Sequence, residues 1–584
     1  MQRIISSLTL LLLIAASAQG QLWKEKVGHS LQAAMATSSP LDVMIVLEEQ
    51  PQVSTDHLTT KEEKANYTYE LLSRTAERSQ ADLWLLLDQY GADYHTYSVV
   101  NSISTRLMPA VIIEIAERAD VRKVIHDPWF ELDLPTGRSS AIDYRMADTT
   151  YGVQMIGAPA LWDQGYKGQG ITIGGQDTGY AWDVDPLRSK YRGWNGSDST
   201  VTHDYHWHDA VHEISPIHGD SLPTADLNPC GLDSPVPCDD NNHGTHTMGT
   251  IVGSTPDEAI GVAPEANWIG CRSLERGWGK LSTYTECFEF FLAPTKVDGS
   301  EPDPTLAPHV LNNSWYCPAE EGCTPETWEV MEIVMQNLKA SGIFIVVSAG
   351  NDGPNCNTIV APPAIFESAF TVGAVNEEEL IANLSSRGPL PADSTTALPH
   401  VVAPGIGVRS VIRNGTFRSF SGTSMAGPHT AGMVALLLSA DPSLAGQVDL
   451  LEDIIMNTTM QKTSTQDCSG ISGMSVPNAV YGHGIIHAPD ALAALLSVRT
   501  IEVPTAQTLL VYPNPTTQSV TFQAAEGERI QRVTIVDMSG RRVHQQIGSH
   551  MTHESLDIGQ LPAGLYLYTV ETETTVHQGK LHKL

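Results

Sequence analysis

The sequence predicts an α/β protein built on a parallel sheet sandwiched by helices, with a smaller unit at each end. Three observations support this fold class. Between residues 141 and 498, short apolar runs alternate with helix-like stretches, as in a parallel sheet covered on both faces. Residues 41–127 instead follow a strand–helix–strand–strand–helix–strand order, and the residues after 500 alternate as strands between turns.

The N-terminal stretch has the element order of a ferredoxin-like α+β unit. "DVMIVLEE" alternates like a strand, residues 61–89 are helical, and "ADYHTYSVVNSISTRLM" indicates two strands broken by a turn. "PAVIIEIAERA" is typical of a helix that opens on Pro109, and "VRKVIHD" of a last strand. Residues 135–140 contain proline, glycine and serine and are interpreted as a linker.

In the central region, the clearest predicted strands are "GITIGGQDTGY", "ANWIGCRSL", "HVLNNSW" and "IFIVVSAGND". Candidate reactive residues come directly after these strands. Open α/β sheets place their sites at the carboxyl ends of strands, so we expect the functional site there.

Composition narrows the possible partners. The chain has 584 residues, 41% of them hydrophobic and 17% charged, which is ordinary for a globular protein. The net charge is −33 and the isoelectric point is about 4.9. A surface this acidic repels nucleic acid and anionic lipid, and we expect neither as a partner.

The first residues indicate export. Arg3 precedes an apolar run from Ile4 to about Ala16, and Ala16-Ser17-Ala18 forms an A-x-A cleavage pattern, which predicts a signal peptide over residues 1–18. A membrane anchor is the alternative, but the run is short and no stop-transfer pattern follows. No later apolar run approaches the roughly 20 residues that span a bilayer, so we expect an exported protein with no stable membrane span.

Cysteine usage agrees with export. The eight cysteines all lie between residues 230 and 468, and eight cysteines allow 105 pairings. Close spacing suggests two small loops and leaves two further pairs: Cys230–Cys238 and Cys317–Cys323, then Cys271–Cys287 and Cys356–Cys468. A cysteine-rich zinc site is less favoured because no CxxC spacing occurs.

Three short stretches carry candidate catalytic residues. In "SFSGTSMAGPHTAGMVALLL", Ser424 opens a helix among small residues that leave room for a carbonyl group, and its own N–H can serve an oxyanion. "DDNNHGTHTMGTIVG" places His243 at another helix start, and "GGQDTGY" ends a strand on Asp177. Taken singly, each residue has a structural reading, such as a helix cap, a buried histidine or a turn. Together, in the order Asp–His–Ser and on three separate strand–helix crossovers, the three residues indicate a catalytic site far more specifically than any one of them does.

These stretches resemble the signatures of the subtilisin-like serine proteases, or subtilases. "DTGY", "HGTHTMGTIVG" and "GTSMAGPHTAG" carry the likeness, and "SAGNDGP" is similar to the family's oxyanion-hole stretch. The resemblance covers residues 162–494. A further, weaker likeness points to the bacillopeptidase F-like branch.

The resemblance implies a role for each residue at a matching position. Asp177 orients the imidazole and stabilises its cation, and His243, rather than His246 one turn later, acts as general base and then acid. Ser424 is the nucleophile. The side-chain amide of Asn351 joins the Ser424 N–H in binding the oxyanion.

Two features depart from the simplest subtilases. The stretch between the aspartate and the histidine is long and rich in histidine (His203, His206, His208, His212 and His218), and we favour a surface insertion beside the cleft over a zinc site because no HExxH pattern is present. Trp315-Tyr316 stands where the family's substrate-pairing strand usually turns on small residues, which leaves the P1 preference open.

The two end units resemble domains that accompany secreted proteases. Residues 19–135 resemble a subtilase propeptide, which implies a folding chaperone and inhibitor removed by self-cleavage between residues 132 and 150; an independent binding domain is the alternative. Residues 505–584, with "YPNPTTQSV", "DMSGRRV" and "LPAGLYLYTV", resemble the C-terminal sorting domain of type IX secretion in Bacteroidota. A carbohydrate-binding or generic β-sandwich module is the alternative there.

The sequence therefore predicts a secreted serine endopeptidase, made as a self-processed zymogen and located outside the cell or on the outer-membrane surface. A non-peptidase serine hydrolase would be expected to show a G-x-S-x-G elbow and the order Ser–Asp–His. An adhesin on an inactive scaffold would be expected to lack at least one catalytic residue. Catalysis needs no cofactor in this reading; a structural calcium ion is possible, with Asp239 and Asp240 as candidate oxygen ligands but no legible ligand set.

Overall fold

The computed structural model describes residues 22–132, 134, 149–196, 200–215, 228–317, 323–391, 393, 395–499, 509–524, 528–537, 541–548, 551–572 and 576–583. The chain divides into two compact units, Met1–Leu495 and Leu496–Leu584. The predicted signal peptide, the predicted linker at 135–140, most of the expected processing region and His218 lie outside the described residues.

The N-terminal segment, residues 22–132, forms a four-stranded antiparallel sheet in the order β2-β3-β1-β4, as the ferredoxin-like prediction requires. Its elements are α2 (Leu22–Lys26), α3 (His29–Ala34), β1 (Leu41–Leu47), α4 (Lys61–Tyr90), β2 (Tyr94–Tyr97), β3 (Ser102–Leu107), α5 (Pro109–Ala116) and β4 (Val121–His126). The long helix α4 begins with a capping box between Thr60 and Glu63 and ends at Gly91, whose φ is 62°.

The central sheet has seven parallel strands in the order β13-β12-β11-β10-β6-β8-β7, which confirms the predicted α/β class. The strands are β6 (Thr172–Asp177), β7 (Trp207–Asp209), β8 (Asn267–Arg272), β10 (Val310–Asn313), β11 (Phe344–Ser348), β12 (Phe370–Val375) and β13 (Val401–Pro404). β6 and β10 to β13 are buried along their whole length, as expected for a sheet covered on both faces.

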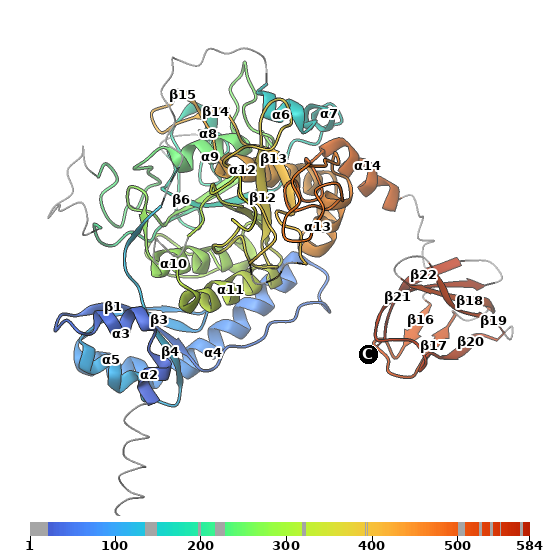
Figure 1. Ribbon diagram of the computed structural model, residues 1–584, viewed down its shortest axis with the longest axis horizontal. Helices are drawn as coiled ribbons and strands as arrows, with labels where there is room; N and C mark the ends of the chain where they lie inside the picture. The colour runs from blue at the N-terminus through green and yellow to red at the C-terminus, as the bar shows by residue number, and fades with distance from the viewer. Residues whose placement is uncertain are drawn as a thin grey trace, which may run out of the picture. The chain divides into compact units, whose positions relative to one another are not determined.

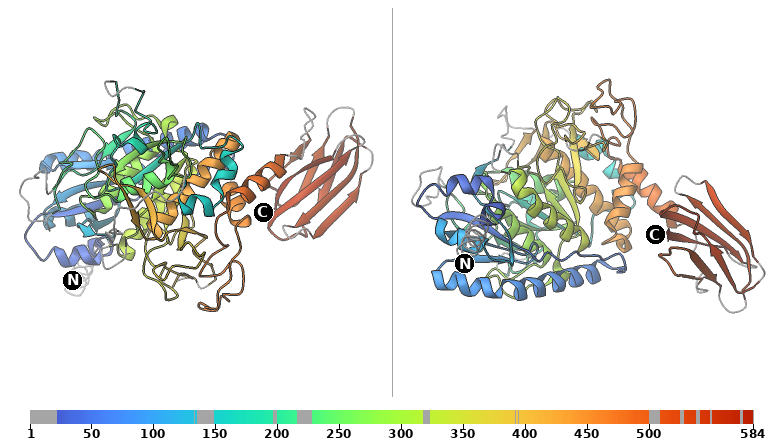
Figure 2. Two further views of the ribbon diagram at one scale, coloured as in Figure 1. Left: turned by 90° about the horizontal axis from the view of Figure 1, so that it is seen from above. Right: turned by 60° about the horizontal axis from the view of Figure 1, so that its bottom comes forward.

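Four helices cover this sheet. α9 (His243–Val252) and α12 (Thr423–Ala440) pack together on one face, and α10 (Leu281–Leu292) and α11 (Pro325–Ala340) cover the other (Figure 1). All residues of α12 except Ser439 are buried, so this helix lies inside the molecule. The N-terminal segment contacts α10 and α11 through β2 and α4, and Figure 2 shows it lying along that side.

Shorter elements complete the first unit: β5 (Phe130–Glu131), α6 (Tyr151–Met155), α7 (Ala158–Trp162), α8 (Asp185–Arg188), β9 (Trp278–Gly279), η2 (Pro304–Leu306), β14 (Val408–Val411), β15 (Phe417–Phe420), η4 (Pro442–Leu444), α13 (Val448–Asn457) and α14 (Ala488–Arg499), which continues across the boundary between the units. All four suggested cysteine pairs are disulfides in the structure. Over the residues described, no helix is both long and apolar enough to cross a membrane.

The histidine-rich stretch differs from the predicted surface insertion. Its residues 207–209 form β7, which pairs in parallel with β8 and extends the central sheet. Trp207 is fully buried, and Asp209 accepts two hydrogen bonds of 2.8 Å from the guanidinium of Arg272. No strand was predicted here because β7 is only three residues long and two of its residues are polar.

The second unit is all-β, as expected. One sheet has the order β16-β17-β20 and the other β19-β18-β21-β22, and every pairing is antiparallel. The strands are β16 (Leu510–Tyr512), β17 (Ser519–Gln523), β18 (Ile530–Asp537), β19 (Arg542–Ile547), β20 (His553–Asp557), β21 (Gly564–Thr572) and β22 (Val576–Lys583). Apolar residues from both sheets, among them Val520, Phe522, Val533 and Val570, form its core.

Candidate active site

Asp177 and His243 lie in direct contact. β6 ends on Asp177 and α9 begins on His243, and His243 Nδ1 lies 2.7 Å from Asp177 Oδ1 and 2.9 Å from Oδ2. Both side chains are almost completely buried. The backbone N–H of Thr178 also donates to Asp177 Oδ1, at 2.7 Å. The carboxylate therefore holds the imidazole with its proton on Nδ1 and leaves Nε2 free to act as a base.

Two glycines permit this close approach. A Cβ atom on Gly244 would lie 2.1 Å from the Gly179 carbonyl oxygen and 3.0 Å from Asp177 Cβ. Gly179 has a φ of 99°, and a Cβ atom there would lie 1.8 Å from the Cys238 carbonyl oxygen. The strand end and the helix start are thus packed backbone to backbone, which only glycine allows.

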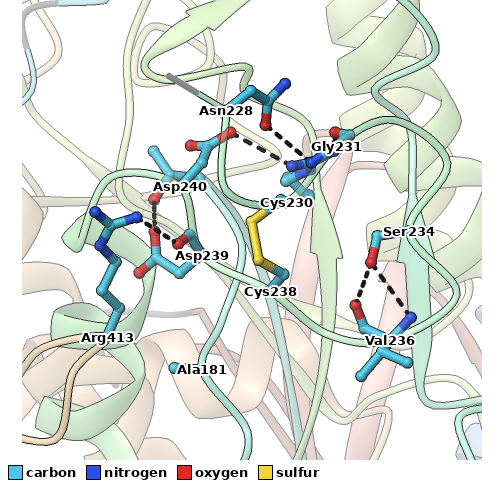
Figure 3. Close-up of a disulfide and its surroundings, with 12 residues drawn as sticks. Ala181, Asn228, Cys230, Gly231, Ser234, Val236, Cys238, Asp239, Asp240 and Arg413 are labelled. Atoms are coloured by element: carbon cyan, nitrogen blue, oxygen red, sulfur yellow. Dashed lines mark hydrogen bonds and ion pairs between the residues drawn. A yellow bond between two sulfur atoms is a disulfide. The ribbon is translucent and has the colours of Figure 1, made fainter. Parts of the chain in front are cut away.

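The segment that leads into α9 is fixed by the Cys230–Cys238 disulfide (Figure 3). The Tyr180 N–H donates to the Cys238 carbonyl at 3.1 Å, and the Asp239 carboxylate accepts bonds from Thr178 Oγ1 at 2.9 Å and Thr245 N at 3.0 Å. Asp239 therefore ties the Asp177 loop to the first turn of α9.

This arrangement does not favour the two candidate calcium ligands. Asp239 is already surrounded by hydrogen-bond donors, and Asp240 forms an ion pair of 3.4 Å with the buried Arg272. The two carboxylates stabilise the protein scaffold around His243.

Ser424 lies in the first turn of α12 and is 2% exposed. Its Oγ donates to the Ser314 carbonyl oxygen at 2.8 Å, and Ser314 Oγ donates to the Ser424 carbonyl oxygen at 2.9 Å. His243 Nε2 makes no hydrogen bond within the described part of the chain. The structure thus joins Asp177 to His243 and turns the Ser424 hydroxyl toward Ser314 instead of His243. Catalytic hydrogen bonds commonly form only in the substrate complex.

Asn351, which follows β11, is placed beside the start of α12. Its side-chain Oδ1 accepts from the Thr423 N–H at 2.9 Å and from Thr423 Oγ1 at 3.1 Å. With the oxygen held by the residue that precedes Ser424, the amide NH₂ group remains available as a donor next to Ser424.

His246 has a structural role. Its Nε2 donates to the carbonyl oxygens of Val408 and Arg418, both at 3.0 Å, and its ring stacks on Phe420 with centroids 4.3 Å apart. Burial, together with neighbouring His243, lowers the pKa of His246 to about 3 despite these bonds. A neutral histidine held by two strands is consistent with His243, and not His246, as the base.

One contributor to the site was not identified from the sequence. Ser314 lies at the end of a predicted strand, and the residues around it do not indicate its contact with Ser424. Trp315 is 1% exposed and stacks on Tyr284 with ring centroids 3.9 Å apart, so this unusual residue is part of the core beside the site.

The histidine-rich stretch contributes other contacts. His206 Nδ1 accepts from Arg192 at 2.9 Å, and Tyr191 lies 2.9 Å from His203 Nδ1. His208 Nε2 and His212 Nε2 lie 2.7 Å and 3.0 Å from the carboxylate of Glu286 in α10. None of these four histidines contacts Asp177, His243 or Ser424 in the residues that the structure describes.

Comparison with known proteins agrees with the fold. Residues 168–484 match the model of the subtilase family, and residues 510–583 match the secretion system C-terminal sorting domain. The sorting domain indicates type IX secretion of Bacteroidota and thus a secreted or cell-surface protein.

Individual relatives are similar over the same region. The chain is 33% identical to bacillopeptidase F of Bacillus subtilis over 453 residues, which are 75% of this chain and 29% of that one. It is 29% identical to subtilisin E of Bacillus subtilis over 297 residues, 50% of this chain and 62% of that protein. The chain thus spans less than two thirds of either relative. Because the family match covers more than half of its length, the chain belongs to the subtilase family.

Proposed function

We propose that this chain is a secreted serine endopeptidase that hydrolyses peptide bonds of proteins through an acyl-enzyme on Ser424. The observation that carries the proposal is the buried Asp177–His243 contact of 2.7 Å, made on a helix that packs against the one bearing Ser424. The family match supports the same chemistry.

The proposed reaction begins when the Ser424 hydroxyl turns from the Ser314 carbonyl to His243 Nε2. His243 takes the hydroxyl proton as Ser424 Oγ attacks the substrate carbonyl, and Asp177 stabilises the resulting imidazolium. The Asn351 amide and the Ser424 N–H donate to the oxyanion. His243 then protonates the leaving amine, and water, deprotonated by His243, releases the acyl group. Each step uses groups of this chain, so the proposed catalysis requires no cofactor.

We assign residues 19–135 as a propeptide that inhibits the enzyme domain, residues 141–498. β5 pairs with β9 in antiparallel register, and the Leu132 N–H donates to the Gly277 carbonyl at 2.9 Å. Phe130 stacks on Tyr284 with centroids 5.9 Å apart, and Tyr284 stacks in turn on Trp315, the residue after Ser314. The stack links β5 to the residue beside Ser314, the partner of Ser424, which supports an inhibitory role for this segment.

A second set of contacts supports the same assignment. The carboxylate of Glu289 in α10 accepts hydrogen bonds from Ser98 N at 2.9 Å, Ser98 Oγ at 2.6 Å and Val99 N at 2.6 Å. One side chain of the enzyme domain thus caps the end of β2 in the N-terminal segment.

In the proposed organisation, residues 1–18 are a signal peptide and residues 505–584 are the sorting unit. The partner of the sorting unit is the type IX secretion machinery. A structural calcium ion remains a prediction. The esterase alternative is disfavoured by the chain order Asp–His–Ser, and the adhesin alternative by the presence of all four residues Asp177, His243, Asn351 and Ser424.

The test compares the full chain with its Ser424→Ala variant, following intact mass and casein digestion; Ser300→Ala, an exposed serine, is the matched control. The proposal predicts that the parent and the control shorten between residues 132 and 150 and digest casein, while Ser424→Ala stays full-length and inert. If Ser424→Ala shortens but is inert, another protease removes the propeptide. If it digests casein as fast as the parent, Ser424 is not the nucleophile.

A further inference from the structure

A cluster of potential metal ligands lies where the N-terminal segment meets the enzyme domain. His95 of β2, His212 after β7 and Glu286 of α10 each offer one ligand atom, and these three atoms lie within 4.8 Å of one another. The His95 and His212 rings have centroids 4.9 Å apart. Three elements distant in the sequence thus bring two imidazoles and a carboxylate to one point.

The hydrogen bonds around the cluster orient His212 for coordination. Its Nδ1 lies 2.5 Å from Asp233 Oδ1, while its Nε2 lies 3.0 Å from both carboxylate oxygens of Glu286. Metal-bound histidines commonly donate their other ring N–H to a carboxylate, which fixes the tautomer. With the proton on Nδ1, the Nε2 lone pair faces the Glu286 carboxylate, and a second proton or a metal ion must lie between these two acceptors.

The surrounding charge also favours a cation. A cavity of about 320 Å³ at this boundary is lined by five acidic residues, Asp42, Asp93, Asp127, Glu213 and Glu286, and by two basic ones, Arg106 and Lys280. The two basic residues form ion pairs with Asp42 and Glu213. Among the described residues of the lining, no lysine or arginine is paired with Glu286.

A proton on His212, or on His208, whose Nε2 lies 2.7 Å from Glu286 Oε1, would satisfy Glu286 without His95. The third ligand group, His95 from the other side of the boundary, is the observation that favours a metal ion over a proton. We propose that His95, His212 and Glu286 bind one Zn²⁺-type divalent ion, with solvent as the fourth ligand. Two imidazole nitrogens and a carboxylate oxygen are a donor set that Zn²⁺ prefers, whereas Ca²⁺ and Mg²⁺ prefer oxygen alone.

The site has a consequence for the two parts of the protein. His95 belongs to the N-terminal segment, and His212 and Glu286 belong to the enzyme domain, so the bound ion ties one to the other. By linkage, any ion that binds the joined form more tightly than the separated parts stabilises the joined form. Removal of the ion is therefore expected to loosen the N-terminal segment.

The test uses the untagged full chain with Ser424→Ala, which prevents self-cleavage and makes the result independent of peptidase activity. After chelation, the protein is titrated with Co²⁺ as a spectroscopic probe and with Zn²⁺ by calorimetry. The proposal predicts one equivalent of bound ion and the visible spectrum of tetrahedral cobalt. His95→Ala, His212→Ala and Glu286→Gln should each weaken binding at least tenfold, and Asp233→Asn by about 10- to 100-fold.

His57→Ala is the matched control, because His57 lies in the same segment but contacts Tyr67 instead of the cluster; it should bind as the parent does. Circular dichroism checks the folding of each variant, and His95→Gln replaces His95→Ala if the latter misfolds. The proposal is overturned if the parent binds no cobalt, which leaves a protonated His212–Glu286 pair, or if both His95 variants bind with unchanged affinity. A finding that the enzyme has no peptidase activity would leave this result untouched.

Discussion

Ser314 and Ser424 exchange two hydrogen bonds, one from each hydroxyl to the other residue's carbonyl oxygen. Helix geometry explains one of them. The Ser424 carbonyl would normally accept from the N–H four residues later, but that residue is Pro428, which has none. Ser314 Oγ takes the place of the missing donor at 2.9 Å. The turn that carries Ser424 is therefore attached to the end of the neighbouring strand β10.

Ser314→Ala should destabilise this turn. The substitution leaves the buried Ser424 carbonyl without a donor, which should lower the free energy of unfolding by about 1–3 kcal/mol. Urea unfolding in the Ser424→Ala background measures this without self-digestion and keeps the carbonyl in place. The exposed Ser300→Ala serves as control. Equal midpoints for Ser314→Ala and the control would refute the fastening role.

Asn351→Ala should reduce catalysis with little effect on substrate binding. If its amide donates to the oxyanion, its loss removes an interaction made mainly in the transition state, and kcat should fall by about 10²–10³, the size found for the corresponding donor of subtilisin, a relative of this chain. Steady-state kinetics on a peptide substrate separate kcat from KM, with exposed Asn457→Ala as control. A rise in KM with unchanged kcat would contradict the oxyanion role.

Much of the fold could be predicted because the pattern is local. The apolar runs that became β6, β8, β10 and β11 are long enough to be recognised, and the alternation of strands and helices gave the parallel sheet. β7 was missed because it has only three residues, two of them polar. Its stability comes from the packing of Trp207 and from the Asp209–Arg272 ion pair, and no local sequence pattern reveals either contact.

The residues of the candidate site could be predicted where they lie in short motifs. Asp177, His243, Asn351 and Ser424 stand in conspicuous short motifs, and the structure brings the first two into contact. The partnership of Ser314 with Ser424 joins residues 110 positions apart and depends on how β10 meets α12. Pro428 was the one local signal, since a proline inside a helix leaves a carbonyl to be satisfied by another group.

Glu289→Gln should weaken the attachment of the N-terminal segment. The carboxylate accepts three hydrogen bonds from Ser98 and Val99, and bonds to a charged acceptor contribute about 1.5–3 kcal/mol each, more than bonds to a neutral amide. Amide hydrogen exchange in the Ser424→Ala full chain should speed up around residues 94–107. Exposed Glu332→Gln on α11 should not change it. Unaltered exchange in Glu289→Gln would argue against this contact as an anchor.

The enzyme domain should lose stability in acid, partly through His246. Burial lowers the pKa of His246 to about 3, below the value of about 6.5 expected in the unfolded chain. The folded form therefore binds fewer protons, and its stability is full above pH 6.5 and declines as the pH falls toward 3, by about 1.4 kcal/mol per pH unit for this group.

Urea unfolding at a series of pH values in the Ser424→Ala background measures this slope. His246→Gln should reduce the slope between pH 6 and pH 4 by about one proton, whereas Ser300→Ala, which has no titratable side chain, should keep it. The assignment fails if His246→Gln and the parent show the same slope.

The central claim is that Asp177 and His243 activate Ser424 as a nucleophile. The most direct measurement is fluorophosphonate labelling of the parent and variants after an added protease has removed the N-terminal segment from each, followed by mass-spectrometric mapping of the modified residue. The account predicts a single label on Ser424, strongly reduced in Asp177→Asn and absent in His243→Ala. A label on another serine, or labelling of Ser424 that persists at the parent rate in His243→Ala, would contradict it.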